Sequence, residues 1–558
     1  MDADNASKAT GGPTHAHIVN MEDKAEKDVA HEELKPEYGA RNAEAQEKTM
    51  TLLQAIKLYP TAIGWSMVLS TALVMEGYDL LLLSNLYASP LFNQKYGVLG
   101  SKGEYAVPAS WQSGLSNGAR CGEMLGLAIN GIVSEKYGYR KTMIGSLLMM
   151  IGTIFILFFA PNVQVLLVGE ILCGIPWGVF QTLTTAYASE VSPVVLRPYL
   201  TTYVNLCWVM GQFIASGVLR ASLQRSDEWA YKIPFAVQWV WPVPLLVGCF
   251  LAPESPWWEV RRGNREGAKR ALERLTSASN PHYTVEETLE MIEHTNDLEK
   301  SLSEGTSYWD CFKGVDRRRT EIVCGVWLVQ TLCGTNVMGY STYFLKQAGL
   351  PTIQSFNMSL GQQALGVVGT LLSWFLISRA GRRTIYLSGV SILCVILMVV
   401  GFISLAPPSN TSATWAIGVM LLVFTFIYDF TVGPVCYSLV SEISSTRLKT
   451  KTIVLARIGY NISNTVINVL TNYQLNPTAW AWGAKTAFFW GCTCFCCVVW
   501  VFFRLPEPKG RTYAEIDVLF QSGVSPRKFK TTEVDTFQTG HTSALEKTIS
   551  TAYDIKEQ

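Results

Sequence analysis

Charged residues are scarce in this chain, and long parts of it have almost none. Asp, Glu, Lys and Arg make up 16% of the 558 residues, whereas hydrophobic residues make up 49%. The charges gather in the first 57 residues, in 253–320 and after Pro506. Uncharged runs as long as those between these segments are rarely core helices of a soluble protein, and they predict a body that lies in a membrane.

Residues that would carry catalysis are missing as well. The six histidines lie in the tails or the central loop, so none is available for a proton relay at membrane depth. There is no nucleotide-binding loop, metal-ligand cluster or nucleophile constellation, so we expect neither an enzyme nor a cofactor or metal site. The C-x-C-x-C-C pattern at 492–497 lies in an apolar run, where cysteines act as small packing residues. The polar N-terminal tail contains no signal peptide, so the first apolar run is expected to direct insertion.

Twelve apolar runs are long enough to cross a bilayer, which takes about 20 residues per helix. They cover approximately 61–85, 111–133, 143–160, 164–188, 199–221, 233–252, 321–345, 359–378, 384–406, 414–440, 452–474 and 484–504. Lys and Arg cluster after the even-numbered runs, and the positive-inside rule then places both termini in the cytoplasm. The predicted fold is an all-α integral membrane protein with twelve transmembrane helices in two six-helix halves.

The two predicted halves carry matching loops about 250 residues apart. S-E-V-S-P-V-V-L-R at 189–197 recurs as S-E-I-S-S-T-R-L-K at 441–449, and P-E-S-P at 253–256 is echoed by P-E-P-K-G at 506–510. A doubled set of membrane helices with matching loops indicates a two-halved transporter. The expected parts are a cytoplasmic tail (1–60), a first bundle (61–252), a cytoplasmic linker with short helices (253–320), a second bundle (321–505) and a cytoplasmic tail (506–558).

Several charges fall inside the apolar runs, where they are costly and usually face a cavity or a partner. Glu76 and Asp79 are three residues apart on one helical face, and two close carboxylates cannot both ionise cheaply. One of them is therefore expected to carry a proton, although a buried hydrogen-bonded pair without a transport role is the alternative. Arg457 is the expected counter-charge, and Arg120 and Glu123 are expected to pair with each other.

These features together resemble the sugar-porter branch of the major facilitator superfamily over roughly 60–515. The matching motifs are the doubled Gly-Arg-Arg type loop, S-E-x-x-P-x-x-x-R after the fourth run, G-Q at 211–212, Q-x-x-x-x-x-N in the seventh run, G-P-V at 433–435 and P-E-x-K-G-R-T at 506–512. E-G-Y-D at 76–79 and G-E-I-L-C-G-I-P-W-G at 169–178 are similar to fungal α-glucoside (maltose-type) permeases. Glu170 departs from the pattern, because many sugar porters place an Arg there. This departure strengthens the case for Arg457 as the cation.

The resemblance also implies a sugar site. Gln212, Gln330 and Asn336 match the amides that bind sugar in this family, and Tyr437 stands where many relatives place a sugar-stacking Trp. Tyr340 is a further candidate from the seventh run. Amides satisfy sugar hydroxyls and an aromatic ring covers the apolar face of the pyranose. Hydrogen bonding between helices is the alternative role for each of these side chains.

Charged loops between the runs are candidates for a cytoplasmic gate. Ion pairs among them would hold the halves together when the sugar site faces outward, or the charges would only orient the chain during insertion. The candidates are Glu135, Arg140, Glu190 and Arg197 in the first half and Arg379, Arg382, Glu442 and Arg447 in the second. Asn410, in N-T-S at 410–412, is a candidate glycosylation site on the outer side.

The resemblance therefore implies a proton-coupled symporter that imports maltose-like α-glucosides by alternating access. A passive sugar facilitator and an exporter of a fungal metabolite on the same scaffold are the alternatives. The expected partners are a small sugar, a proton and membrane lipid, with no nucleic acid, and one copy of the chain forms the transport unit. The expected location is the plasma membrane.

Overall fold

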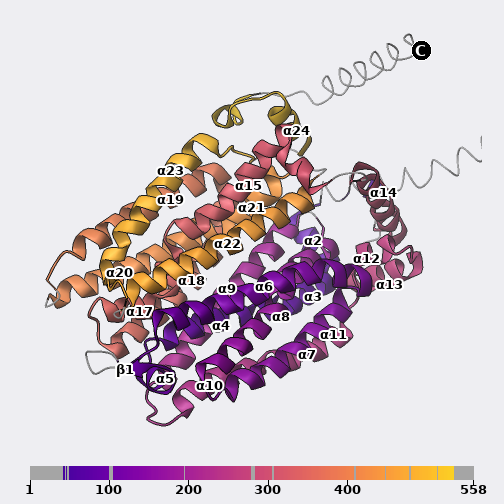
Figure 1. Ribbon diagram of the computed structural model, residues 1–558. Helices are drawn as coiled ribbons and strands as arrows, with labels where there is room; N and C mark the ends of the chain where they lie inside the picture. Colours follow the sequence, from indigo (N-terminus) through magenta and orange to yellow (C-terminus); the bar gives the residue numbers. More distant parts are fainter. Residues whose placement is uncertain are drawn as a thin grey trace, which may run out of the picture.

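The computed structural model describes residues 50–99, 105–193, 195–277, 283–303, 307–407, 410–445, 448–476, 479–509, 511 and 513–532, together with 42, 43 and 46. Long helices run roughly parallel in two bundles that lie side by side, the first drawn indigo to magenta and the second orange to yellow (Figure 1). This confirms the predicted all-α fold in two halves.

The first bundle begins with α2 (Leu52–Leu58) and a first membrane helix that is broken at Thr71 into α3 (Pro60–Ser70) and α4 (Ala72–Leu86). It continues with α5 (Pro90–Tyr96), β1 (Val98–Leu99), β2 (Tyr105–Ala106), α6 (Ala109–Tyr137), α7 (Tyr139–Phe158), α8 (Val163–Val191), α9 (Arg197–Ser222), α10 (Trp229–Val237), η1 (Gln238–Val240) and α11 (Pro242–Leu251). The two short strands pair antiparallel, with Val98 opposite Ala106.

The second bundle follows a linker that contains α12 (Pro256–Arg261), α13 (Arg265–Leu275), α14 (Val285–Ser303) and η2 (Tyr308–Phe312). Its elements are α15 (Gly314–Leu332), α16 (Thr335–Gly339), α17 (Ser341–Gln347), α18 (Thr352–Arg379), α19 (Arg382–Ile403), α20 (Thr411–Ile427), the π-helical turn η3 (Tyr428–Val432), α21 (Gly433–Ile443), α22 (Lys449–Leu475), η4 (Gly483–Lys485) and α23 (Thr486–Arg504). α24 (Tyr513–Gln521) and η5 (Pro526–Lys528) end the described chain.

Each of the twelve predicted runs coincides with a helix or a broken helix. Among the described residues, 10 helical segments are long and apolar enough to cross a membrane. α6 falls outside that set because it is rich in Ser, Gly and Asn and carries Arg120 and Glu123. The seventh segment falls outside it because it is divided into α15, α16 and α17, starting at Gly334, whose left-handed backbone (φ 92°) ends α15.

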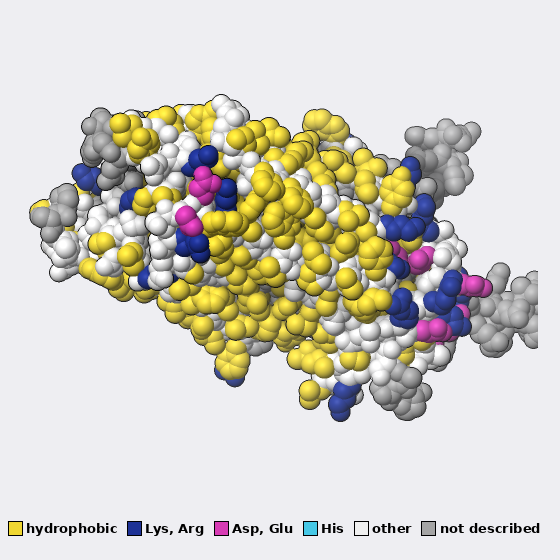
Figure 2. Space-filling view, turned by 90° about the horizontal axis from the view of Figure 1, so that it is seen from below, with side chains coloured by type: hydrophobic (Ala, Val, Ile, Leu, Met, Phe, Trp, Pro, Cys, Tyr) yellow, Lys and Arg dark blue, Asp and Glu magenta, His cyan; other side chains and the backbone are white. Residues whose placement is uncertain are grey.

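The outer surface fits a lipid environment. Hydrophobic side chains cover the middle of the face in Figure 2, and Lys and Arg gather mostly at the end where the linker helices lie. Large apolar side chains on the membrane helices are widely exposed, such as Ile132 (72%), Val395 (62%) and Phe402 (62%). Apolar exposure on this scale marks a membrane surface rather than a water-facing one. We call the end that carries α12–α14 and α24 the linker end, and the opposite end the far end.

Very close helix packing in the first bundle joins α6 to α8. Gly122 and Gly126 of α6 face Gly174 and Gly178 of α8, and a Cβ on any of them would lie 2.0–2.2 Å from a backbone carbonyl oxygen of the other helix. Small residues allow this approach of two backbones in a membrane. Because Gly178 rests against the carbonyl of Glu123, the polar side chains of both helices are brought within reach of each other.

Candidate functional site

Two buried acids, two half-buried arginines and one amide meet inside the bundles. Gln181 of α8 donates from Nε2 to Glu76 Oε1 of α4 at 2.6 Å and to Glu123 Oε1 of α6 at 2.7 Å. Its Oε1 accepts from Nε of Arg457, on α22 of the second half, at 3.2 Å and also from Nη2. Arg120 Nη1 pairs with Glu123 Oε2 at 2.9 Å, as predicted. We call these five residues the central cluster.

Charge in the central cluster is balanced when both acids are ionised. Glu76 and Glu123 are 2% and 0% exposed, so neither carboxylate is stabilised by bulk water. Arg457 Nη2 also lies 3.9 Å from Glu123 Oε1, and its guanidinium sits 4.8 Å from the ring centres of both Trp327 and Tyr460. A cation between aromatic faces and carboxylates is held strongly when desolvated. The cluster therefore ties the two halves together through one arginine.

Asp79 lies outside this cluster. Its carboxylate accepts from Gln238 Nε2 of η1 and shares a hydrogen bond with Glu170 of α8, and both acids are 1% exposed. Two carboxyl groups can share a hydrogen bond only when one of them holds a proton. Within the described part of the chain, no cation contacts Asp79. The reversed sign at Glu170 therefore gives Asp79 an acidic neighbour instead of an ion-pair partner.

The structure corrects the predicted pairing of Glu76 with Asp79. The two side chains are on neighbouring parts of one face, but each has its own partners, because α8 runs antiparallel to α4 and offers Gln181 to the first and Glu170 to the second. Arg457 reaches the Glu76 group through Gln181 and does not contact Asp79. Glu76 and Asp79, which the sequence presents as one pair, therefore belong to two separate groups of side chains.

The predicted sugar residues are all buried or half-buried in the membrane segments. Gln330 donates to the carbonyl of Gly433 at 3.1 Å, and Asn336 donates to Asn468 Oδ1 at 3.1 Å, so these two amides join helices of the second half. Tyr340 OH lies 3.0 Å from Ser116 Oγ of the first half. Tyr437 packs edge-on against Trp327, 5.1 Å between ring centres. Gln212 is 4% exposed on α9.

Several further amide atoms in the membrane helices are buried without a hydrogen-bond partner. They belong to Asn117 of α6, Asn205 of α9, Gln363 of α18 and Asn461 of α22. Buried amides are nearly always satisfied in folded proteins. Orphaned donors and acceptors on helices from both halves provide the groups that a polyhydroxyl ligand needs.

Most of the hydrogen bonds between the halves among the described residues lie toward the far end. They are Ser84 Oγ to the Gly339 carbonyl (2.9 Å), Ser116 to Tyr340 (3.0 Å), Lys346 Nζ to the Ala88 carbonyl (3.2 Å), Asn476 Nδ2 to the Val107 carbonyl (3.2 Å) and Arg220 Nε to Asn357 Oδ1 (2.5 Å). The Gln181–Arg457 contact is, among the described residues, the hydrogen bond between halves that lies nearest the linker end. The far end is thus closed by hydrogen bonds.

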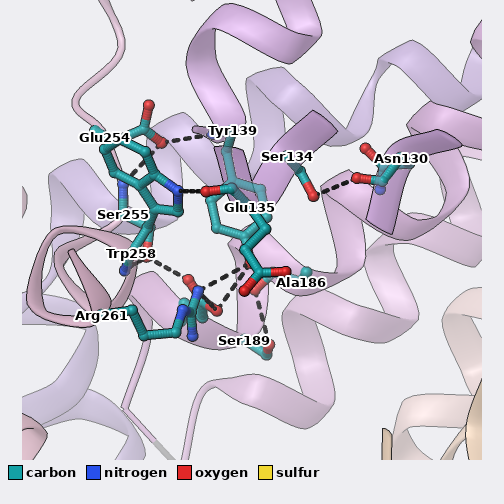
Figure 3. Close-up of polar contacts among 11 residues, drawn as sticks. Asn130, Ser134, Glu135, Tyr139, Ala186, Ser189, Glu254, Ser255, Trp258 and Arg261 are labelled. Carbon is teal, nitrogen blue, oxygen red and sulfur yellow. Dashed lines mark hydrogen bonds and ion pairs between the residues drawn. The ribbon is translucent and has the colours of Figure 1, made fainter. Parts of the chain in front are cut away.

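At the linker end of the first half, two carboxylates organise the start of α7 (Figure 3). Glu254 accepts from the backbone N–H of Tyr139 at 2.9 Å, while Glu190 accepts from Tyr139 OH at 2.9 Å and pairs with Arg261 at 2.7 Å. Burial raises the pKa of the Glu254 carboxyl above its ordinary value, against the opposing effect of the backbone N–H donors. Arg140 donates to the carbonyls of Cys249 and Phe250.

The second half repeats this arrangement with different side chains. Glu507 accepts from the backbone N–H groups of Arg382 (2.8 Å) and Arg383 (3.1 Å), as Glu254 does at α7. Arg382 pairs directly with Glu442 at 3.1 Å. In the first half, the corresponding acid Glu190 is instead contacted by Tyr139 and Arg261 together. The doubled motifs therefore reflect a structural repeat.

The gate between these charged loops stays a prediction, because its ion pairs would hold the halves together only when the sugar site faces outward. The ion pairs that the structure describes at the linker end lie within one half, because each acid binds the helix start next to it. Of the remaining candidates, Glu135 is exposed, and its backbone carbonyl accepts from Trp258. Arg197 Nε donates to the Ser192 carbonyl, and Arg379 lies over the Phe375 ring at 3.8 Å. Arg447 lies outside the described residues. Asn410 is exposed and caps α20 through Ala413 N.

Sequence reasoning missed several residues of these groups. Gln181, Gln238 and Trp327 are ordinary residues of apolar helices, and only their contacts show their importance. Asp429 could have been found from the sequence, since it is an acid inside the predicted apolar run 414–440. It is 4% exposed in the π-turn η3 and lies against Gly366 of α18.

The sequence of this chain matches a family of known proteins. The Sugar (and other) transporter family matches residues 65–520. The chain belongs to this family. Maltose permease MAL61 of Saccharomyces cerevisiae is 44% identical over 513 residues, which cover 91% of this chain and 83% of the yeast protein. The general alpha-glucoside permease of the same species is 44% identical over 527 residues, which cover 93% of this chain and 85% of that protein.

Solved structures of sugar transporters share the fold. The proton:xylose symporter XylE bound to 6-bromo-6-deoxy-D-glucose superposes with a TM-score of 0.68 at 19% identity, over 83% of this chain and 99% of that one. XylE from E. coli in a partially occluded inward-open conformation gives 0.66 at 18% identity, over 81% of this chain and 100% of that one. At this identity the likeness shows the major facilitator fold alone. The chain is a multi-pass membrane transporter.

Proposed function

We propose that this protein is a proton-coupled symporter that carries maltose-like α-glucosides into the cell across the plasma membrane. The single observation that carries the proposal is the buried central cluster, in which a proton-accepting carboxylate of one half is linked to an arginine of the other. The yeast relatives named maltose and alpha-glucoside permeases support the sugar class. Both termini and the linker lie in the cytoplasm, so the linker end is the cytoplasmic end.

Alternating access follows from the contacts between the halves. The hydrogen bonds near the far end hold the outer side closed in the conformation described. A sugar released to the cytoplasm must pass the linker end, where the described ion pairs stay within each half and do not oppose separation. The loop carboxylates Glu190 and Glu442 keep each half rigid while the halves rock against each other.

Proton coupling is assigned to the two acidic groups. A proton from outside reaches the neighbouring acids Asp79 and Glu170, which hold it between them, and Glu76, whose carboxylate balances Arg457 and Arg120 through Gln181 and Glu123. Loading a proton makes the central cluster net positive by one charge. Such a change at a site with little water shifts the balance between two arrangements of the halves.

Sugar binding is assigned to Gln212, Gln330, Asn336, Tyr340 and Tyr437. Gln330 and Asn336 exchange their present bonds between helices for bonds to sugar hydroxyls, as amides in a preformed polar site do. The orphaned amide atoms on α6, α9, α18 and α22 supply additional donors and acceptors. We also propose that Asn410 is glycosylated, since it is exposed at the start of α20 on the outer side.

Uptake of labelled maltose and glucose in yeast cells that lack their own permeases tests the proposal. We expect the chain to accumulate maltose above the external concentration, and an uncoupler to abolish this accumulation because the proton gradient drives it. A facilitator would equilibrate maltose with or without the uncoupler, and an exporter would lower the internal level. Either of these results would overturn the proposed function.

A further inference from the structure

Gln181 occupies an unusual position in the central cluster. It is an uncharged side chain among four charged ones, and each of its polar atoms is used: Nε2 binds two carboxylates of the first half and Oε1 binds the guanidinium of Arg457 from the second half. The reverse orientation of the amide would turn its oxygen toward Glu76 and Glu123 and its N–H groups toward Arg457. Because that arrangement repels on both sides, the charges fix which way the amide points.

The same amide also takes part in the hydrogen bond between the two halves that lies nearest the linker end among the described residues. Of the hydrogen bonds between halves in the described residues, only the one from Arg457 to Gln181 lies toward the linker end, while the others lie near the far end. Opening of the cytoplasmic side must therefore break it. The charge of Arg457 reaches the first half by this bond and by a longer approach of 3.9 Å to Glu123.

We infer that Gln181 is the positioning residue that couples the proton on Glu76 to the opening of the cytoplasmic side, acting as a latch on Arg457. The inference rests on the proposed function and deepens it by assigning a role to Gln181 within the central cluster. While Glu76 is ionised, two carboxylates hold both N–H groups of Gln181 and aim its oxygen at Arg457. Once Glu76 binds a proton, that charge-assisted bond becomes a neutral one of about half the strength, and the latch loosens.

Other titratable groups surround Glu76 and set the background of this switch. They are Glu123 and Arg120 of α6, Arg457 of α22, Tyr437 of α21 and, one turn along α4, Asp79. Glu76 and Glu123 both accept directly from Gln181 Nε2, so a change of charge on Glu76 alters the pull on Gln181. Loss of the proton to the cytoplasm restores the ionised carboxylate, which recaptures the amide and then Arg457. A carrier without a proton therefore stays closed toward the cytoplasm, and this is what makes the coupling tight.

Three variants of the full-length protein in proteoliposomes test the inference. Gln181→Leu removes the latch, and Gln181→Glu keeps an acceptor for Arg457 but adds a carboxyl next to Glu76. Thr182→Val is the matched control, since Thr182 also bridges α8 to α6 through Asn130 Nδ2 at 2.7 Å without touching the central cluster. Each variant is assayed for maltose accumulation under an imposed proton gradient and for maltose counterflow without one, at several pH values.

We expect Gln181→Leu to lose accumulation by roughly tenfold or more, as loss of a hydrogen bond to charged groups implies, while counterflow remains and loses its pH dependence. Gln181→Glu should move the pH of half-maximal uptake upward, because an added carboxyl strengthens proton binding at Glu76. This second variant decides the matter if the leucine variant does not reach the membrane. Thr182→Val should behave as the wild type does.

Other outcomes overturn the inference. If both Gln181 variants accumulate maltose with the pH profile of Thr182→Val, or if they lose accumulation and counterflow equally with no shift in pH, then Gln181 has only a packing role. If the wild type itself fails to accumulate maltose, the proposed function fails and the inference falls with it. The wild-type measurement therefore separates the two failures.

Discussion

Substitution of Gly126 by alanine should separate α6 from α8. An added Cβ would lie 2.0 Å from the carbonyl oxygen of Ile175, about 1.5 Å inside the optimum for such a contact. Both groups belong to helix backbones, so the strain cannot be relieved by a side-chain rotation. The helices must move apart by about 1 Å or more, and overpacking of this kind costs about 1–3 kcal/mol. Transport should fall too, because separating the helices would stretch the 2.7 Å hydrogen bond from Gln181 Nε2 of α8 to Glu123 Oε1 of α6.

Gly131→Ala on the same helix provides the control, because no atom lies within 4 Å of the added Cβ. It should be neutral or stabilising by about 0.5–1 kcal/mol, from the higher helix propensity of alanine. The assay compares melting temperatures of the two purified variants in detergent and their maltose uptake in vesicles. Equal melting temperatures and equal uptake for the two variants would refute the view that backbone contact between α6 and α8 positions the central cluster.

Two other substitutions test separate parts of the structure. Glu170→Gln should still donate a hydrogen bond to Asp79 and leave expression unchanged, but the glutamine cannot share a proton with Asp79. Both Glu170→Gln and Asp79→Asn should therefore abolish accumulation in the uptake assay. Accumulation by both variants would show that this pair carries no proton. Arg319 is 3% exposed, donates to the carbonyls of Ile443 (2.8 Å) and Ser444 (3.0 Å) and pairs with Asp517 of α24. Arg319→Leu should destabilise the protein by about 3–5 kcal/mol, and Asp517→Asn by about 0.2–1 kcal/mol; equal melting temperatures for the two would contradict this.

The twelve helices could be predicted because hydrophobic run length depends only on the thickness of the bilayer, and that signal is local in sequence. Breaks within helices were harder to predict. Gly334 ends α15 by a left-handed backbone, and η3 is a π-turn at Asp429, and neither interrupts the apolar pattern that defines a run. The repeat of the loops was equally visible, because Glu254 and Glu507 each bind the start of the helix that follows a glycine, Gly138 or Gly381.

The site was only partly predictable, because contacts between helices depend on packing that no single helix encodes. Glu76, Asp79 and Arg457 stood out as charges in apolar runs, yet their partners could not be read from spacing on one helix. Gln181 and Gln238 decide which acid joins which group, and amides of this kind occur in many membrane helices without a role in transport. The loop charges stood out as a doubled set, but the pairing that the structure describes within each half follows from how α7 and α19 start.

Proton movement during sugar entry tests the central claim most directly. A pH electrode records the unbuffered medium of cells that express this chain while maltose is added. We expect the medium to become more alkaline as maltose enters, and we expect this effect to disappear in the Glu76→Gln and Asp79→Asn variants. Entry of maltose with no change in external pH would contradict a symport mechanism, even though the fold and the family would stand.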